Sequence, residues 1–261
     1  MGIDIHVEQY DRDGYCLVPG VFDTVKLAEL EIEFDRVTQQ LRTSGENTNA
    51  VWDLAASEDG RDLEITHTHF VERYSAVWLR ALLDPGFVDI AAALIGQDVI
   101  LHHSKLFLKP PGTGAPFPVH QDWRYFPTAD DSMLAAIIHL SPATIDMGCV
   151  YVHPGSHRQG KRSSTSGRAR WDDPDGYRAF SAEHQQADAV PVEAQPGDVL
   201  FLSYLTAHSS GPNTSPHSRK TVLAQLYSGN DTLDPESEHP RSDLVLRGWN
   251  HNATRHSVAR T

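Results

Sequence analysis

Short apolar runs separated by proline and glycine turns fill residues 98–228, and this pattern limits the possible folds more than any other feature. Residues 99–101 and 199–203, for example, consist almost wholly of Val, Ile, Leu and Phe and have the length of single strands. Turn sequences such as Pro154-Gly155-Ser156 and Gln195-Pro196-Gly197-Asp198 lie between the runs. Strands joined in this way pair in antiparallel order, so the sequence predicts two antiparallel sheets that form a barrel.

The first third of the chain has helical periodicity instead. Asp23 and Thr24 can cap a helix whose apolar residues recur near helical spacing up to Leu41. Residues 71–95 are expected to form two helices interrupted at Asp84-Pro85-Gly86. This segregation predicts an α+β fold with a mainly β core, namely a double-stranded β-helix (a jelly-roll or cupin-like barrel) flanked by N-terminal helices.

The chain is expected to form a single domain over residues 1–261, because no internal repeat and no linker of biased composition divides it. Its helical part would span about residues 1–97 and its barrel core about residues 98–228. The polar C-terminal part from Gly229 is expected to be a peripheral, poorly ordered tail.

Two further segments lack a regular pattern. Residues 43–62 are polar and irregular, which is typical of a loop. Residues 158–186 are rich in Arg, Ser, Gly and Asp and are long for a loop in a compact domain, so we expect a lid or a mobile insertion there. Trp171 is a candidate residue of such a lid.

Composition restricts the partners and the compartment. The formal net charge of −13 argues against a nucleic-acid or anionic-membrane partner, because those surfaces attract basic proteins. No apolar run is long enough to cross a bilayer, and no apolar segment follows the N-terminus as a signal peptide would require. Cys16 and Cys149 alone form no disulfide framework. These features predict a cytoplasmic protein and leave its oligomeric state open.

Fifteen histidines direct attention to metal chemistry, and the segment His120-Gln121-Asp122 is the first candidate. On an extended segment, residues i and i+2 project from the same side, so an imidazole nitrogen and a carboxylate oxygen would converge. A second histidine would complete the two-histidine, one-carboxylate set of non-haem iron(II) oxygenases. The spacing alone is weak, because His-x-Asp is common by chance.

His208 and Arg219 supply the missing parts of such a site. His208 follows the strand at residues 199–203, and in an antiparallel barrel the ends of strands distant in sequence meet at one mouth. Many oxygenases of this kind need an α-keto acid whose far carboxylate lies inside the barrel, where burial without a partner is costly. Arg219, on the next strand, offers a permanently charged, planar and bidentate partner.

Taken together, these motifs resemble the phytanoyl-CoA dioxygenase family of Fe(II)- and 2-oxoglutarate-dependent oxygenases. The similarity runs from Asp13-Gly14-Tyr15 to about Tyr227 and thins in the two irregular segments and the tail. The ordered motif set is far more specific than any of its members. It consists of Lys109-Pro110-Pro111-Gly112, His120-Gln121-Asp122-Trp123-Arg124-Tyr125-Phe126-Pro127, Pro154-Gly155-Ser156-His157, Pro196-Gly197-Asp198, and His208-Ser209-Ser210-Gly211-Pro212-Asn213 with Arg219.

The resemblance implies roles for six residues. Iron would be bound by His120, Asp122 and His208, with 2-oxoglutarate and O₂ as co-substrates. Arg219 aligns with the arginine that binds the distal carboxylate of 2-oxoglutarate, Ser210 with a hydroxyl that assists it, and Lys105 with a side chain lining the same pocket. For Lys105 the alternative is a lysine whose stem lies along the sheet surface.

The same resemblance implies the reaction. Halogenating relatives have a small residue in place of the carboxylate ligand, so Asp122 favours hydroxylation of an unactivated C–H bond, or a related desaturation, epoxidation or ring formation. The expected substrate is a small molecule, a secondary-metabolite intermediate rather than an acyl-CoA. Two alternatives stay open: a cupin-like metal-binding isomerase or binding module without oxygenase activity, and a catalytically inactive relative with a binding role.

The remaining histidines are expected to be mainly structural. His67 and His69 can lie on one face of a strand at residues 63–70, but no third ligand is spaced to join them. His102 and His103 lie beside a strand expected to line the pocket, so one of them is a candidate substrate contact.

Overall fold

The computed structural model describes residues 3–44, 49–51, 64–162, 188–237 and 239–253. The segments expected to be irregular, residues 43–62 and 158–186, therefore lie largely outside the described residues, and so does Trp171. Within the described part of the chain, every helix is too short or too polar to span a membrane.

The helices precede the long central strand, as the periodicity predicts. They are α1 (Ile3–Asp13), α2 (Thr24–Ser44), α3 (Val71–Tyr74), α4 (Ala76–Leu82) and α5 (Pro85–Ile95). The expectation of two helices over residues 71–95 was wrong, because Ser75 is extended and starts a new helix by accepting hydrogen bonds from the backbone N–H groups of Val77 and Trp78. The expected break at Asp84 is confirmed: its side chain caps α5, with Pro85 at the first helical position.

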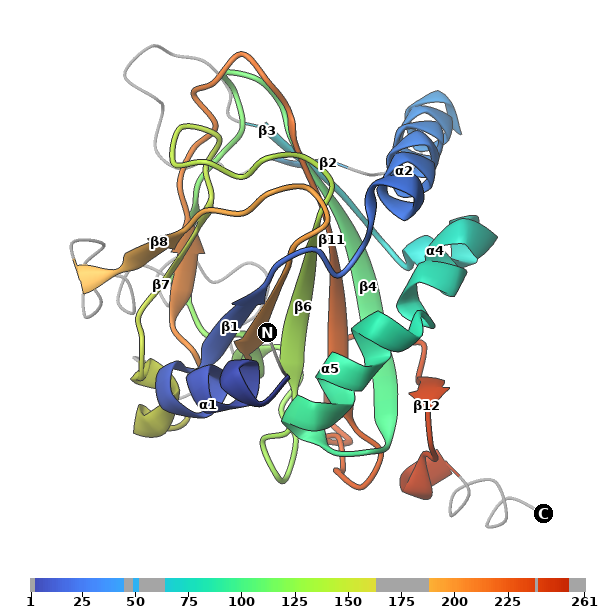
Figure 1. Cartoon of the computed structure of the whole chain (residues 1–261), viewed down its shortest axis with the longest axis vertical. Coiled ribbons are helices and arrows are strands. Elements are labelled where there is room, and N and C mark those ends of the chain that lie inside the picture. Colours follow the sequence, from blue (N-terminus) through green and yellow to red (C-terminus); the bar gives the residue numbers. More distant parts are fainter. Residues whose placement is uncertain (1–2, 45–48, 52–63, 163–187, 238, 254–261) are drawn as a thin grey trace.

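The larger sheet is antiparallel throughout, in the order β1-β9-β6-β11-β4-β3-β2, with β12 added beside β4. Figure 1 shows helices α2, α4 and α5 on the outer side of this sheet. Their apolar residues pack with one set of alternate strand residues, for example Leu106, Phe201 and Val222. The strands are β1 (Tyr15–Val18), β2 (Asn49–Val51), β3 (Glu64–His69), β4 (Val99–Lys109), β6 (Leu134–His139), β9 (Val199–Ser203), β11 (Arg219–Ser228) and β12 (Leu244–Arg247).

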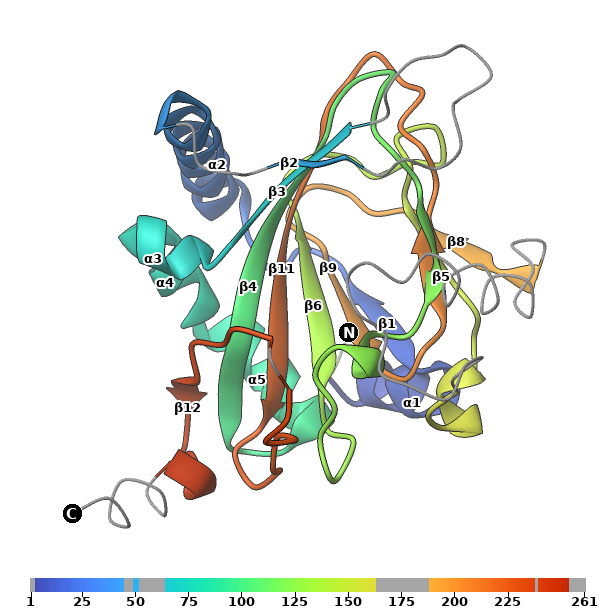
Figure 2. The ribbon, with the colours of Figure 1, turned by 180° about the vertical axis from the view of Figure 1, so that it is seen from behind.

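The smaller sheet faces the inner side of the larger one (Figure 2). Its order is β5-β10-β7-β8, from β5 (Phe117–His120), β10 (His208–Ser210), β7 (Val150–Val152) and β8 (Val190–Val192). Inward residues of both sheets, such as Ile137, Leu200 and Val152, form a second apolar cluster between them. Two facing antiparallel sheets with short connections make the double-stranded β-helix that the sequence predicts.

The C-terminal segment differs from its expectation. Residues 229–237 and 239–253 are not a peripheral tail: β12 pairs with β4, and the backbone N–H of Ser242 donates to the carbonyl of His102. Asp231 is buried and accepts hydrogen bonds from the backbone N–H groups of Asp130 and Ser132. Polar side chains and backbone hydrogen bonds hold much of this segment, so its low apolar content misled the sequence prediction.

Candidate metal centre and co-substrate pocket

Two histidines from paired strands and an aspartate from the following turn meet at one place in the barrel. His120 ends β5, Asp122 opens the short 3-10 helix Asp122–Arg124, and His208 begins β10 as the cross-strand partner of His120. The Nε2 atoms of His120 and His208 lie 3.4 and 3.8 Å from Oδ1 of Asp122. One ligand atom from each residue lies within 4.8 Å of the others, so a single ion can contact all three.

The two imidazoles are oriented by the same local bond. Nδ1 of His120 faces the carbonyl of Pro118, and Nδ1 of His208 faces the carbonyl of Thr206, both at 2.9 Å. A carbonyl only accepts, so each Nδ1 carries a proton, and in the uncharged ring Nε2 is then the nitrogen with the lone pair. This hydrogen bond fixes the tautomer and ring orientation that metal-binding histidines require.

The charges of the group suit a divalent cation. Burial by itself raises the pKa of Asp122, but the rings of His208 and His120 outweigh it and lower that pKa to about 2. Burial, reinforced by His120, lowers the pKa of His208 to about 4. Near neutral pH Asp122 is therefore a carboxylate and His208 an uncharged imidazole, the forms in which these side chains bind metals.

The triad opens into a cavity of about 130 Å³ between the sheets. Alternate residues of β11, namely Arg219, Thr221, Leu223 and Gln225, line one wall, as the period of two in a strand requires. The volume is close to that of engineered cavities of about 150 Å³ that hold benzene, so a small organic acid can fit.

Arg219 lines this cavity, and the buried side chain of Lys109 lies next to it. They are direct partners across β11 and β4, and burial lowers the pKa of Arg219 to about 10 and that of Lys109 well below its usual value. Nζ of Lys109 donates to Oγ of Ser210 at 2.7 Å and to the carbonyl of Gly211 at 2.5 Å.

No carboxylate of the described residues neutralises Arg219 and Lys109. Arg219 donates from Nη1 to the carbonyl of Gly148, but its buried Nε has no hydrogen-bond partner among the described residues. In that part of the chain no carboxylate forms an ion pair with Arg219 or Lys109. Burying two like charges is costly unless an anion joins them, and a bound carboxylate would satisfy the free guanidinium edge.

Lys105 lies on the cavity wall together with Asp122 and not on the outer sheet surface. Burial lowers its pKa to about 8, and the Asp122 carboxylate partly offsets that effect. Ser210, Tyr125 and Phe126 also line the cavity. The residues chosen from the sequence therefore gather around one space.

Two residues of this region were missed in the sequence. Lys109 was noticed only as the start of a Pro-Pro-Gly turn, and its place opposite Arg219 depends on the register of β4 and β11. His139 on β6 lines the cavity, and burial with the charge of Arg219 lowers its pKa to about 4. Neither residue belongs to a recognisable motif. Which residue it faces depends on how distant strands pair, and the sequence around each residue does not reveal that pairing.

The other histidines are arranged differently from the sequence expectation. His67 and His69 share one face of β3, as expected, but a third ligand does join: His103 and His239 lie next to His69. His102 and His103 are absent from the lining of the cavity described above. The expectation that no further ligand lies near His69 was therefore wrong, because His239 comes from the distant C-terminal segment.

Comparison with known proteins gives one family match and many relatives. The family model described as phytanoyl-CoA dioxygenase matches residues 10–221. A probable phytanoyl-CoA dioxygenase of Caenorhabditis elegans is 25% identical over 233 residues, covering 86% of this chain and 74% of the relative. An ectoine dioxygenase of Bordetella bronchiseptica is 26% identical over 245 residues, covering 88% of this chain and 76% of the relative.

Solved structures agree on the fold. The epimerase SnoN, solved in complex with Fe³⁺, α-ketoglutarate and nogalamycin RO, superposes with a TM-score of 0.73 at 21% identity. The match covers 94% of this chain and 98% of that one. The superposition therefore extends over nearly the whole of both chains.

Proposed function

Since the chain belongs to the phytanoyl-CoA dioxygenase family, we propose that His120, Asp122 and His208 bind the iron(II) of a 2-oxoglutarate-dependent oxygenase. The enzyme class follows from the family and the relatives: the protein is an iron(II)- and 2-oxoglutarate-dependent dioxygenase that oxidises a small molecule. The observation that carries the residue assignment is the convergence of two Nε2 atoms on Asp122 with both Nδ1 atoms held by carbonyls.

Arg219 is proposed to bind the distal carboxylate of 2-oxoglutarate. Its unpartnered Nε and the adjacent Lys109 supply the charge, and the Lys109 bond orients Ser210, which lines the same cavity. Lys105 is proposed to line the co-substrate pocket on the side of Asp122. When bound, the iron with 2-oxoglutarate and O₂ supplies the oxidising power, and the protein supplies ligation, orientation and exclusion of water.

The proposed reaction is hydroxylation, or a related oxidation, of an unactivated C–H bond. Asp122 occupies the ligand position that stays free in halogenating enzymes, so halide binding at the iron is not favoured. Tyr125 and Phe126 present aromatic surface to the cavity, which suits a small, partly apolar substrate. The relatives named for ectoine and the structure solved with nogalamycin RO support a secondary-metabolite intermediate.

The proposed partner of the protein is a small-molecule substrate. With a net charge of −13, the protein is proposed to act as a single domain on a small molecule without binding nucleic acid or a membrane surface.

The test is co-substrate turnover. Metal-stripped protein supplied with iron(II), ascorbate and 2-oxoglutarate should release succinate, slowly without substrate and faster with it. A cupin-like isomerase or a binding protein would release none, so a lack of succinate above the metal-free control would refute the proposed role of the triad. A library of small molecules scored by succinate release would then identify the substrate.

A further inference from the structure

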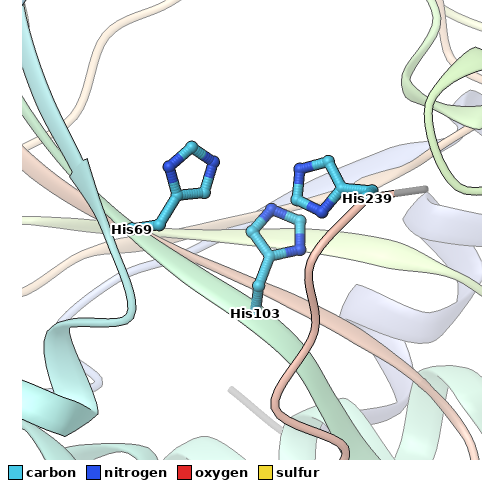
Figure 3. A group of neighbouring side chains, drawn as sticks. All are labelled: His69, His103 and His239. Atoms are coloured by element: carbon cyan, nitrogen blue, oxygen red, sulfur yellow. The ribbon is translucent and has the colours of Figure 1, made fainter.

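A second group of metal-ligating side chains lies apart from the iron-binding triad. His69, His103 and His239 each offer one ring nitrogen within 4.8 Å of the other two. The distance between ring centroids is 4.2 Å for His103 and His239, equal to that between His120 and His208. It is 5.5 Å for His69 and His239 and 5.8 Å for His69 and His103. Figure 3 shows the three rings reaching toward one space from three segments.

Strand register brings two of these histidines together. His69 on β3 pairs with Lys105 on β4, so His103, two residues away, lies diagonal to it on the same face. A bulge at this point of β4 leaves His102 without a partner on β11, because Gln225 pairs with His103 and Leu226 with Leu101.

The third histidine comes from the C-terminal segment. The pairing of β12 with β4 and the hydrogen bond from Ser242 N–H to the carbonyl of His102 hold that segment beside β4. His239, three residues before Ser242, is thereby placed over His103 and is buried. Three segments distant in sequence meet at this group.

Two of the rings are prepared to act as ligands. Nδ1 of His239 lies 2.8 Å from the carbonyl of Pro240, so Nδ1 is the donor and Nε2 keeps its lone pair. Nδ1 of His103 lies 2.7 Å from Nδ1 of His102, while its buried Nε2 has no hydrogen-bond partner among the described residues. A buried ring nitrogen without a partner is uncommon in folded proteins, and in the tautomer that leaves it unprotonated Nε2 of His103 can bind a ligand.

The surroundings of these three histidines keep their imidazole rings uncharged, the form in which imidazole binds a metal ion. Phe126 packs against His103 and His239, and burial lowers the pKa of His69 to about 3 and of His239 to about 4. The positive charge of Lys105 lies nearby and opposes any ion held by charge alone. Calcium and magnesium, which need carboxylate oxygens, are therefore excluded in favour of an ion that bonds strongly to imidazole.

We propose that His69, His103 and His239 form a second metal site, which binds a divalent transition ion of the zinc class. Three neutral imidazoles with an open fourth position are an established ligand set for Zn²⁺. Since the ligands come from β3, β4 and the segment before β12, the ion would fasten the C-terminal segment to the larger sheet. Its ligands are different residues from those of the iron triad.

The experiment isolates the second site by removing the first. In a metal-stripped Asp122→Ala/His208→Ala variant, calorimetric titration with Zn²⁺ should show about one equivalent bound. Adding His69→Gln and His239→Gln should weaken this binding by at least about 100-fold, since changes in outer-shell partners alone cost 10–100-fold. Adding His67→Gln instead is the matched control, because His67 lies on the same face of β3 outside the group, and binding should be retained.

A second measurement separates loss of the site from loss of the fold. Zn²⁺ should slow hydrogen exchange of the amides in residues 239–247 in the triad-deficient variant, and it should raise the melting temperature there. Both effects should vanish with His69→Gln/His239→Gln, whose melting temperature without metal should match that of the His67→Gln control. The proposal is overturned if the triad-deficient variant binds no Zn²⁺, or if it binds Zn²⁺ equally with and without the two histidines.

Discussion

At the scale of single residues, each histidine of the triad is oriented by a hydrogen bond to the backbone carbonyl two residues before it. Both imidazoles use Nδ1 to hold the carbonyl of the residue two positions earlier, so each strand end orients its own ligand. Oδ1 of Asp122 lies 3.4 and 3.8 Å from the two Nε2 atoms, and the two rings lower the pKa of this carboxyl to about 2. Each ligand is thus set by its own backbone, and the carboxylate sets the charge of the site.

Replacing His120 or Asp122 by Ala should abolish iron-dependent 2-oxoglutarate turnover. Removal of one of three ligands should weaken iron(II) binding by at least about 100-fold, more than the 10–100-fold typical of outer-shell changes. Iron content and succinate release measure this, with exposed His217→Ala as the matched control. Full turnover of either variant in metal-controlled buffer would contradict the assignment.

Arg219→Ala should raise the 2-oxoglutarate concentration needed for half-maximal turnover about 10- to 100-fold, because a charged hydrogen bond contributes about 1.5–3 kcal/mol. Lys109→Met should raise it less, since Lys109 reaches the pocket through Ser210 and its loss also relieves repulsion of Arg219. Iron(II) affinity should be unchanged in both variants. An unchanged 2-oxoglutarate requirement in Arg219→Ala would remove Arg219 from the co-substrate site.

At this scale, ordered sequence motifs identify most residues of the pocket. The other residues could not be identified because their positions depend on how distant strands pair. His120, Asp122, His208, Arg219 and Ser210 stand in recognisable spacings, and the structure gathers them. The position of Lys109 depends on which residue of β4 faces Arg219, and that of His239 on a segment more than 130 residues away from His103. Pairing between distant segments is decided by the whole fold.

At the scale of elements, local signals explain the helices and strands well where capping or alternation is strong. The break at Asp84-Pro85-Gly86 and the apolar run of β9 were both predicted from the local sequence. Ser75 was overlooked as a helix start because the flanking residues keep a helical pattern through it. The C-terminal strand β12 was overlooked because the segment around its single apolar run, Leu244-Val245-Leu246, is polar.

Ser75→Ala should lower the free energy of unfolding by about 1 kcal/mol, the usual effect of losing an N-cap oxygen. The oxygen of Ser75 accepts from two backbone N–H groups at the start of α4, and the residue is buried. Denaturant unfolding measures the difference, and Ser75→Asn, which keeps a capping oxygen, should recover much of it. Equal stability of the Ala and Asn variants would show that the cap contributes little.

At the scale of the whole molecule, an acidic protein keeps part of its positive charge inside. The net charge is −13, yet Arg219 and Lys105 line the pocket between the sheets and Lys109 is buried beside Arg219. We expect the negative net charge to disfavour anionic macromolecules, and we propose that the buried basic side chains favour a small dicarboxylate.

The buried histidines should also make the metal-free protein sensitive to acid. Burial is the first cause of a lowered pKa in seven histidines of the described residues: His67, His69, His102, His103, His139, His208 and His239. In the unfolded chain these rings take up protons below pH about 6.5. In the folded chain they resist protonation until the pH approaches 4 or lower, so between these limits the unfolded state binds more protons.

Stability should therefore be full above pH about 6.5 and should fall as the pH drops toward 4, by up to about 1.4 kcal/mol per pH unit for each histidine. Thermal unfolding of the metal-free protein at several pH values measures the slope. His139→Gln should reduce the slope, because it removes a buried ring whose pKa is lowered to about 4. A melting temperature that stays constant from pH 7.5 to 5 would show that these rings are not held neutral by the fold.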